Sequence, residues 1–281
     1  MKRLLSALAV SAALAFASSA NAGLVYLTGH DPDFHSQDAI GGKNQLNVAL
    51  NYVTGGSYNN GTTKFLWVES NLPATSGHRI GFDGLAAIGV GAGNVDRVNA
   101  AGLAGVNFGA YSAIVVASTF GGMLTSAEIN ALIARSGDIA NFVNAGGGLA
   151  AFAECFQTAV CDGSNTAAPT TLFGYLPITV TSVTTVAPYF VTPLGASLGL
   201  TNADVSECCT HNSFGATGGL GVVDRDQNGI ATTLAGNVQI TGGGFTPTIP
   251  EPATWGLMLL GFGGLGAMLR WRRRLGAAFA G

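Results

Sequence analysis

The chain has 281 residues, of which 10% are charged and 42 are glycine, and its formal net charge is −3. All 15 acidic residues lie between Asp31 and Glu251, where only six of the 12 basic residues occur, so this stretch carries a net charge near −9. A field of that sign repels nucleic acid, and we therefore exclude nucleic-acid binding.

The N-terminus has the three parts of a secretory signal peptide. Lys2 and Arg3 precede an apolar run over residues 4–16, and the small-x-small cleavage site Ala20-Asn21-Ala22 follows. We predict cleavage after Ala22, which makes residues 1–22 a signal peptide and places the rest of the chain outside the cytoplasm.

Residues 23–241 are long enough for one sizeable core, and we predict a single exported domain there. Between two apolar runs, Thr125 and Glu128 form a capping box that predicts the start of a helix, with apolar residues at helical spacing after it. A strand, a helix and a second strand in this order predict a βαβ crossover and a parallel sheet covered by helices. The predicted buried strands are the apolar runs 23–28, 64–68, 111–117 and 149–153.

The second half of the domain has a different pattern. Residues 177–191 are rich in Thr and Val, which is typical of an exposed or edge strand. Two apolar runs flank Asn228-Gly229, which predicts a β-hairpin. The spacing Asp224-x-Asp226-x-Asn228 also matches the first half of a calcium loop, but Ala235 stands where that loop has its bidentate Glu, so we favour the hairpin turn.

The C-terminus is organised as a membrane anchor. We predict a Gly/Pro stalk over residues 242–252, a transmembrane helix over residues 253–269 and a cytoplasmic basic tail over residues 270–281. The 17 uncharged residues 253–269 would span roughly 25 Å as a helix, slightly less than a bilayer core of about 30 Å. The arginines after them set the orientation, because Lys and Arg stay on the cytoplasmic side.

This C-terminal pattern resembles the PEP-CTERM sorting signal of Gram-negative bacteria. The resemblance rests on three parts in order, which are Pro250-Glu251-Pro252, a short Gly-rich apolar helix and the cluster Arg272, Arg273 and Arg274. It implies processing by the membrane enzyme exosortase in a cell that makes exopolysaccharide. An ordinary anchor behind a proline-rich stalk is the alternative, but it leaves the Pro-Glu-Pro placement to chance.

The body of the chain resembles the class I glutamine amidotransferase-like architecture in the order of its elements. The resemblance implies an α/β fold, a flavodoxin-like three-layer sandwich with a mainly parallel sheet and a late hairpin. Catalytic members have a cysteine in a Gly-x-Cys-x-Gly elbow and a later His-x-Glu pair. Here Cys155 has no flanking glycines and His211 has no acid two residues on. These two departures from the family pattern argue against amidotransferase activity in this chain.

Polar residues follow several of the predicted strands. In an open α/β sheet, ligands bind beyond the carboxyl ends of the strands, so we expect these residues to share one edge. A divalent cation could be held by the first group, and Glu154 with His211 could perform general acid–base chemistry. The alternative for residues 30–38 is turn and helix-cap chemistry. The candidate metal ligands are His30, Asp31, Asp33 and His35. The candidates for catalysis are Glu154 and His211, and Glu69 is expected at the same edge of the sheet.

The four cysteines are Cys155, Cys161, Cys208 and Cys209. An exported protein is expected to form disulfides, and adjacent cysteines rarely pair because their geometry is strained. We therefore expect Cys155 and Cys161 either to close a small loop or to bridge to the 208–209 pair. A zinc site is the rival interpretation, although neither pair has zinc-ligand spacing.

From the sequence, the leading hypothesis is an exported cell-surface or extracellular-matrix protein with a non-catalytic binding or structural role. It would be anchored in the inner membrane with its body in the periplasm before exosortase processes it, and exopolysaccharide or other matrix components would be its partners. The alternative is an envelope hydrolase or metal-dependent enzyme with its site at the carboxyl edge of the sheet. We expect no cofactor, apart from the divalent cation of that alternative.

Overall fold

The computed structural model describes residues 22–75, 77–155, 171–181 and 183–247. Residues 21–247 belong to one compact unit. Within the described ranges, no helix combines the length and apolar character needed to cross a membrane. The predicted signal peptide up to residue 21, the Pro-Glu-Pro motif, the predicted membrane helix, the basic tail and Cys161 lie outside these ranges.

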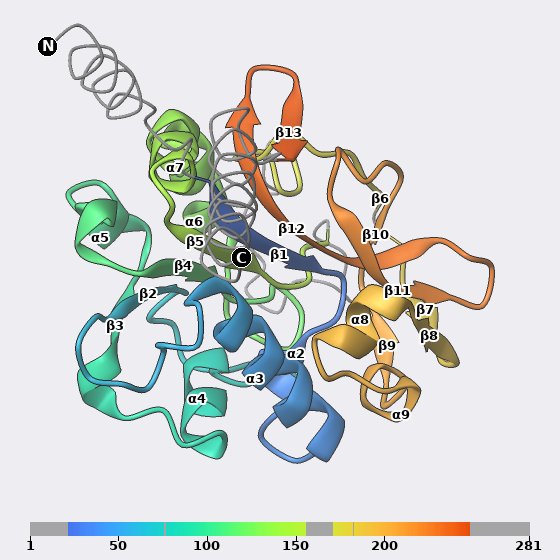
Figure 1. Ribbon diagram of the computed structural model, residues 1–281. Coiled ribbons are helices and arrows are strands. Elements are labelled where there is room, and N and C mark those ends of the chain that lie inside the picture. The colour runs from blue at the N-terminus through green and yellow to red at the C-terminus, as the bar shows by residue number, and fades with distance from the viewer. Residues whose placement is uncertain (1–21, 76, 156–170, 182, 248–281) are drawn as a thin grey trace, which may run out of the picture. The chain divides into compact units, whose positions relative to one another are not determined.

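One sheet of 11 strands organises this unit, and its first five strands are all parallel (Figure 1). Every residue of β2, β4 and β5 is buried, because these short apolar strands are covered on both faces. We call these five strands the parallel half; their order in the sheet is β3-β2-β4-β5-β1. They are β1 (Gly23–Thr28), β2 (Phe65–Val68), β3 (Val95–Val98), β4 (Ala113–Val116) and β5 (Gly148–Ala151).

Helices cover both faces of the parallel half. The chain crosses from β1 to β2 in one direction along the sheet and from β4 to β5 in the other. Right-handed connections in opposite directions place α3 on one face and the α6–α7 pair on the other. In agreement, α2 contacts α3 and α4, while α5 contacts α6. The helices are α2 (Pro32–His35), α3 (Ile40–Val53), α4 (Gly84–Ala87), α5 (Ala100–Leu103), α6 (Ser126–Ala134) and α7 (Ser136–Asn144), with short 3-10 turns η2 (Gly81–Asp83), η3 (Ala92–Asn94) and η4 (Phe108–Ala110).

The capping box predicted for α6 is confirmed. The Thr125 hydroxyl accepts from the Ala127 N–H, and the Glu128 carboxylate accepts from the Thr125 N–H. The helix then breaks at Arg135 before α7 begins. At this break the Arg135 guanidinium donates to the carbonyl groups of Leu103, at the end of α5, and Val106, and it lies 4.0 Å from the ring centroid of Phe108.

The remaining strands form an antiparallel half, so the sheet is mixed rather than mainly parallel. The long strand β12 lies antiparallel to β1 and joins the two halves. It also pairs with β11 and β13, its neighbours along the chain, through hairpins, and it pairs with β10. The further elements are β6 (Val180–Thr181), β8 (Tyr189–Val191), β10 (Ser213–Phe214), β11 (Gly221–Asp226), β12 (Ala231–Thr241), β13 (Gly244–Pro247), the separate pair β7 (Thr185–Val186) and β9 (Cys209–Thr210), and the helices α8 (Pro193–Ser197) and α9 (Asn202–Val205).

Two predictions about this half have different outcomes. The hairpin at Asn228-Gly229 is confirmed as β11–β12, and Gly229 adopts the positive φ of 83° that the turn requires. The stalk predicted from residue 242 begins too early. Residues 244–247 are strand β13, paired with β12 from Thr241↔Gly244 to Val238↔Pro247, so the folded body continues to Pro247.

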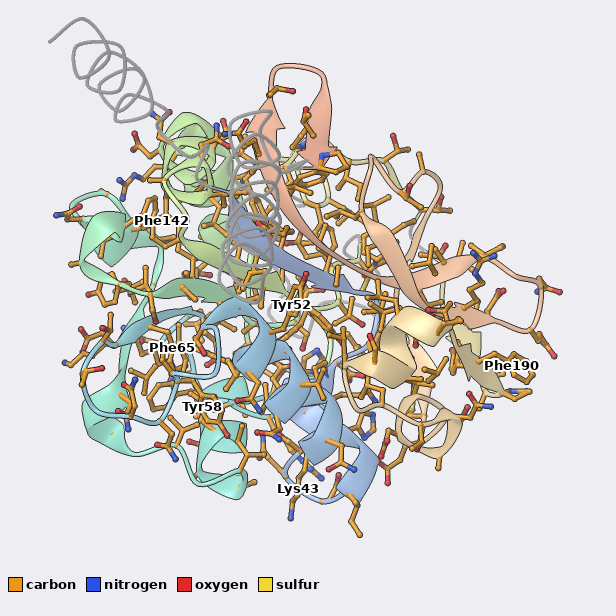
Figure 2. The ribbon with its side chains drawn as sticks, viewed as in Figure 1. Lys43, Tyr52, Tyr58, Phe65, Phe142 and Phe190 are labelled. Atoms are coloured by element: carbon orange, nitrogen blue, oxygen red, sulfur yellow. A yellow bond between two sulfur atoms is a disulfide. The ribbon has the colours of Figure 1, made fainter. Side chains whose placement is uncertain are left out.

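The hydrophobic core is centred on the parallel half. Trp67 of β2 is fully buried, and its ring centroid lies 6.0 Å from that of Phe152. Figure 2 shows Phe65 in the interior, whereas Lys43 extends outward from α3. Phe190 of β8 is 49% exposed, so the antiparallel half has apolar side chains at its periphery.

Candidate functional site

The predicted polar edge exists at the carboxyl ends of the parallel strands. His30, Asp31 and Asp33 follow β1, Glu69 follows β2 and Glu154 follows β5, and all five are buried. Residues 211 and 212 reach the same edge from the antiparallel half. The His211 N–H donates to the Gly29 carbonyl over 2.8 Å, and the Asn212 side chain accepts from the Glu154 N–H over 3.0 Å.

Asp33 fixes the loop after β4. Its carboxylate accepts from the Ser118 N–H over 2.9 Å and from the Ser118 hydroxyl over 2.8 Å. Burial raises the pKa of Asp33 to about 7, although the two hydrogen bonds from Ser118 oppose the shift. Both oxygens are thus engaged within the protein, and Asp33 acts as a loop-holding residue.

Glu69 has even more internal partners. Its oxygens accept from the N–H groups of Gly81, Phe82 and Met123, over distances of 2.6 to 3.1 Å. The indole N–H of Trp67 donates at 3.1 Å, and an Arg97 nitrogen lies 3.1 Å away. Burial raises the pKa of Glu69 and outweighs the opposing effects of Arg97 and the backbone donors. This carboxylate holds three loops together.

Glu154 is also satisfied by its own chain, and the structure does not join it to His211 as the predicted acid–base pair. Its oxygens accept from the Phe173 N–H over 2.6 Å and from the Tyr175 hydroxyl over 2.7 Å. Burial raises the pKa of Glu154 to about 7, while these two hydrogen bonds lower it. His211 instead has its Nε2 atom 3.6 Å from Asp31 Oδ1.

His30 binds the antiparallel half through both ring nitrogens, although it also lines the small cavity that Asp31 and His35 line. Its Nε2 lies 2.8 Å from Asp224 Oδ2 and its Nδ1 lies 3.1 Å from the Cys209 carbonyl oxygen. Burial lowers the pKa of His30, but the charge of Asp224 and these two hydrogen bonds outweigh burial, so the pKa is raised. Both acceptors can be satisfied only if both ring nitrogens carry hydrogen, so we assign His30 as an imidazolium.

The same interaction removes the calcium interpretation of the hairpin. Asp224 is fully buried and accepts from the Thr232 hydroxyl as well as pairing with His30. Asp226 uses one oxygen to accept from the N–H groups of Asn228 and Ile230, over 2.9 and 2.8 Å. These carboxylates therefore organise a turn and a buried ion pair.

Asp31 differs from the other acids of this edge. It is 1% exposed, and neither of its carboxylate oxygens has a hydrogen-bond partner among the described residues. The Nε2 atoms of His35 and His211 each lie 3.6 Å from Asp31 Oδ1, beyond hydrogen-bond distance. The Nδ1 atom of His211 is likewise buried and has no partner within the described ranges.

One part of the cysteine prediction is wrong, because the adjacent cysteines are bonded to each other, whereas the predicted Cys155–Cys161 loop includes a residue outside the described ranges. Cys208 is bonded to its neighbour Cys209, and Cys155 is also in a disulfide. The loop that carries the adjacent pair is held on α3, because Glu207 accepts from the Gly42 N–H over 2.9 Å. Sequence spacing alone does not reveal this adjacent pairing.

The hollow at this edge is small. A cavity of about 10 Å³ is lined by residues that include Asp31, His35, Glu207, Cys208 and Cys209. That volume suits one water molecule or one ion and is far below the roughly 300 Å³ of a typical small-molecule site. Larger surface hollows lie elsewhere, such as one of about 470 Å³ beside Phe214 and Ile230 in the antiparallel half.

The comparisons with known proteins identify one segment. Residues 248–274 match the family described as the PEP-CTERM protein-sorting motif. No curated protein and no solved structure matches the chain, so the amidotransferase-like resemblance gains no support. The match confirms the predicted PEP-CTERM sorting signal over this segment, and it indicates an exported protein that exosortase processes after a membrane-anchored stage.

Proposed function

We propose that this chain is a cell-surface or extracellular-matrix protein whose body has a non-catalytic binding or structural role. The sorting motif over residues 248–274 is the observation that carries the proposal. In this scheme the signal peptide is cut after Ala22, the body stays in the periplasm while residues 253–269 anchor it, and exosortase then releases it toward the exopolysaccharide matrix.

The geometry of the body agrees with a role other than catalysis. The carboxylate oxygens of Asp33, Glu69 and Glu154 accept hydrogen bonds from donors within the protein, so these groups are poorly placed to exchange protons with a substrate. Cys155 is in a disulfide, so it cannot serve as a thiolate nucleophile in this state. Any distant relationship to amidotransferases would therefore concern the fold and not the reaction.

The test is to replace Pro250, Glu251 and Pro252 with alanine in a bacterium that has exosortase. We expect the variant to accumulate in the inner membrane, while the wild-type chain moves to the surface or matrix fraction. Lys43→Ala, on the outer face of α3, is the matched control and should be sorted normally. Normal sorting of the alanine variant would contradict the proposal.

A second candidate, a metal-dependent envelope hydrolase, is favoured by one observation. Asp31 is a buried carboxylate flanked by the Nε2 atoms of His35 and His211, and these are the donor types of a catalytic zinc site. Its test is hydrolysis of an activated aryl ester by the zinc-loaded full chain, with Asp31→Asn as the comparison. Equal rates for both proteins would end this candidate.

A further inference from the structure

The buried Asp31 carboxylate is the one acid of this edge whose environment is incomplete within the described part of the chain. Burying an ionised carboxylate without partners is costly, so such groups are paired or coordinate metals. The 3.6 Å spacing from Oδ1 to the Nε2 atoms of His35 and His211 is too long for a hydrogen bond. It is close to the roughly 3.4 Å that separates two donors bound at about 2.1 Å to one tetrahedral ion.

The cavity beside Asp31 contains a second set of donors. The ligand atoms of His35, Cys208 and Cys209 all lie within 4.8 Å of one another. Asp31 lines the same cavity, whose volume of about 10 Å³ accommodates a single ion. The Cys209 sulfur also lies 4.0 Å from His211 Nε2. The sulfur and imidazole donors therefore lie together, and the Asp31 carboxylate lies on the wall of the same cavity.

The oxidation state of the two sulfurs decides which donors are available. In the structure Cys208 and Cys209 are bonded to each other, and a metal binds the thiolate form of cysteine. A dithiol reductant would transfer two electrons and two protons to this bond, giving two thiols and a new disulfide on the reductant. A bound cation would then replace the two thiol protons.

Contacts other than the disulfide also hold the two cysteines at the cavity. The Cys209 carbonyl accepts from His30 Nδ1. Glu207, which precedes Cys208, is bound to α3 because its carboxylate accepts from the Gly42 N–H. Cys208 and Cys209 are both partly exposed, so a reductant and an ion can reach them. We therefore expect the loop to stay near Asp31 and His35 when the disulfide is reduced.

We propose that Asp31, His35, Cys208 and Cys209 form a redox-gated site for one zinc-class cation, closed by the Cys208–Cys209 disulfide and completed when that bond is reduced. His211, whose Nε2 lies 3.6 Å from Asp31 Oδ1 and 4.0 Å from the Cys209 sulfur, is a positioning residue for that carboxylate. The inference does not depend on sorting. It uses some of the residues of the hydrolase candidate but requires no reaction of a substrate.

The experiment measures zinc binding to the full chain, purified in detergent, before and after treatment with a dithiol that is removed under nitrogen. We expect one zinc ion per reduced chain, with an affinity about 100-fold higher than in the oxidised chain. Cobalt added to the reduced protein should give the intense charge-transfer absorption of thiolate ligation. Equal zinc binding in both states, or none in either, would overturn the proposal.

Variants separate this site from the other cysteines. Cys208→Ser with Cys209→Ser should abolish the gain on reduction, whereas Cys155→Ser with Cys161→Ser should retain it. Asp31→Asn should weaken zinc binding about tenfold while the cobalt–thiolate absorption remains, and circular dichroism checks that each variant is folded. Retention of the gain in the Cys208/Cys209 variant, or unchanged affinity in Asp31→Asn, would overturn the assigned ligands. Zinc binding without ester hydrolysis would support this site and end the hydrolase candidate.

Discussion

Two buried carboxylates at the carboxyl edge of the sheet, one beyond β2 and one beyond β1, have opposite surroundings. Beyond β2, Glu69 is surrounded by backbone N–H groups, an indole N–H and Arg97. Beyond β1, where the antiparallel half arrives, Asp31 is equally buried but has two imidazoles beyond hydrogen-bond distance and sulfur atoms across a small cavity. The difference indicates that Glu69 stabilises the fold, whereas Asp31 is available for a ligand.

The largest expected effect comes from removing the satisfied carboxylate. Glu69→Ala leaves several buried N–H groups without their acceptor and removes the ion-pair partner of Arg97, and we expect a loss of about 4 kcal/mol in the free energy of unfolding. The midpoint of urea unfolding measures it. Asp138→Ala, which removes an exposed partner of Arg135, should change stability by less than about 0.5 kcal/mol. Similar urea midpoints for the two variants would contradict the assignment of Glu69 as an acid that stabilises the fold.

A smaller effect is expected in the pH dependence of stability. Because burial raises the pKa of Glu154 to about 7, the folded state holds a proton that the unfolded state releases at a lower pH. The stabilising contribution is complete below the unfolded pKa of about 4.5 and is lost as the pH rises to about 7, a change of about 3 kcal/mol.

Glu154→Gln should therefore make the unfolding free energy fall less steeply between pH 4.5 and 7, because the amide does not titrate and can still bond with Phe173 and Tyr175. Asp33, whose pKa burial also raises to about 7, should keep the rest of the slope. Urea midpoints across this pH range provide the measurement, with Asp138→Asn as the control that keeps the wild-type slope. A slope unchanged in Glu154→Gln would mean that another group carries the pH dependence.

The smallest expected effect has the opposite sign. With a chelator present, Asp31→Asn should leave the unfolding free energy unchanged or raise it by up to about 1 kcal/mol, because it removes a buried charge that lacks hydrogen bonds within the described residues. Urea unfolding of the oxidised chain tests this. A loss comparable to that of Glu69→Ala would show that Asp31 is a structural acid and would remove the distinction drawn above.

Much of the architecture could be predicted because it depends on local patterns. The apolar runs that became β1, β2, β4 and β5 are buried on both faces, and the capping box at Thr125 marks where α6 begins. The arrival of Asp31, Glu69 and Glu154 at one edge follows from parallel strands, whose carboxyl ends lie together. The extent of the antiparallel half was missed, because β6 and β10 are only two residues long and carry almost no periodicity.

The partners of the site residues could not be predicted. His30 pairs with Asp224 across 194 positions, and Cys208 bonds to its neighbour although spacing argues against it. These outcomes depend on how β12 brings the hairpin and the α9–β9 loop back against β1, and loop closure over such separations leaves no local signal.

The sequence by itself determined the sorting address, since the motif over residues 248–274 is a linear signal of charge and hydrophobicity. It also determined the strands of the parallel half and the edge at which polar residues gather. Only the tertiary structure decided that Asp33, Glu69 and Glu154 are satisfied while Asp31 is not. The physical reason is that hydrogen-bond satisfaction is set by donors from distant loops, which only the folded chain brings within 3 Å.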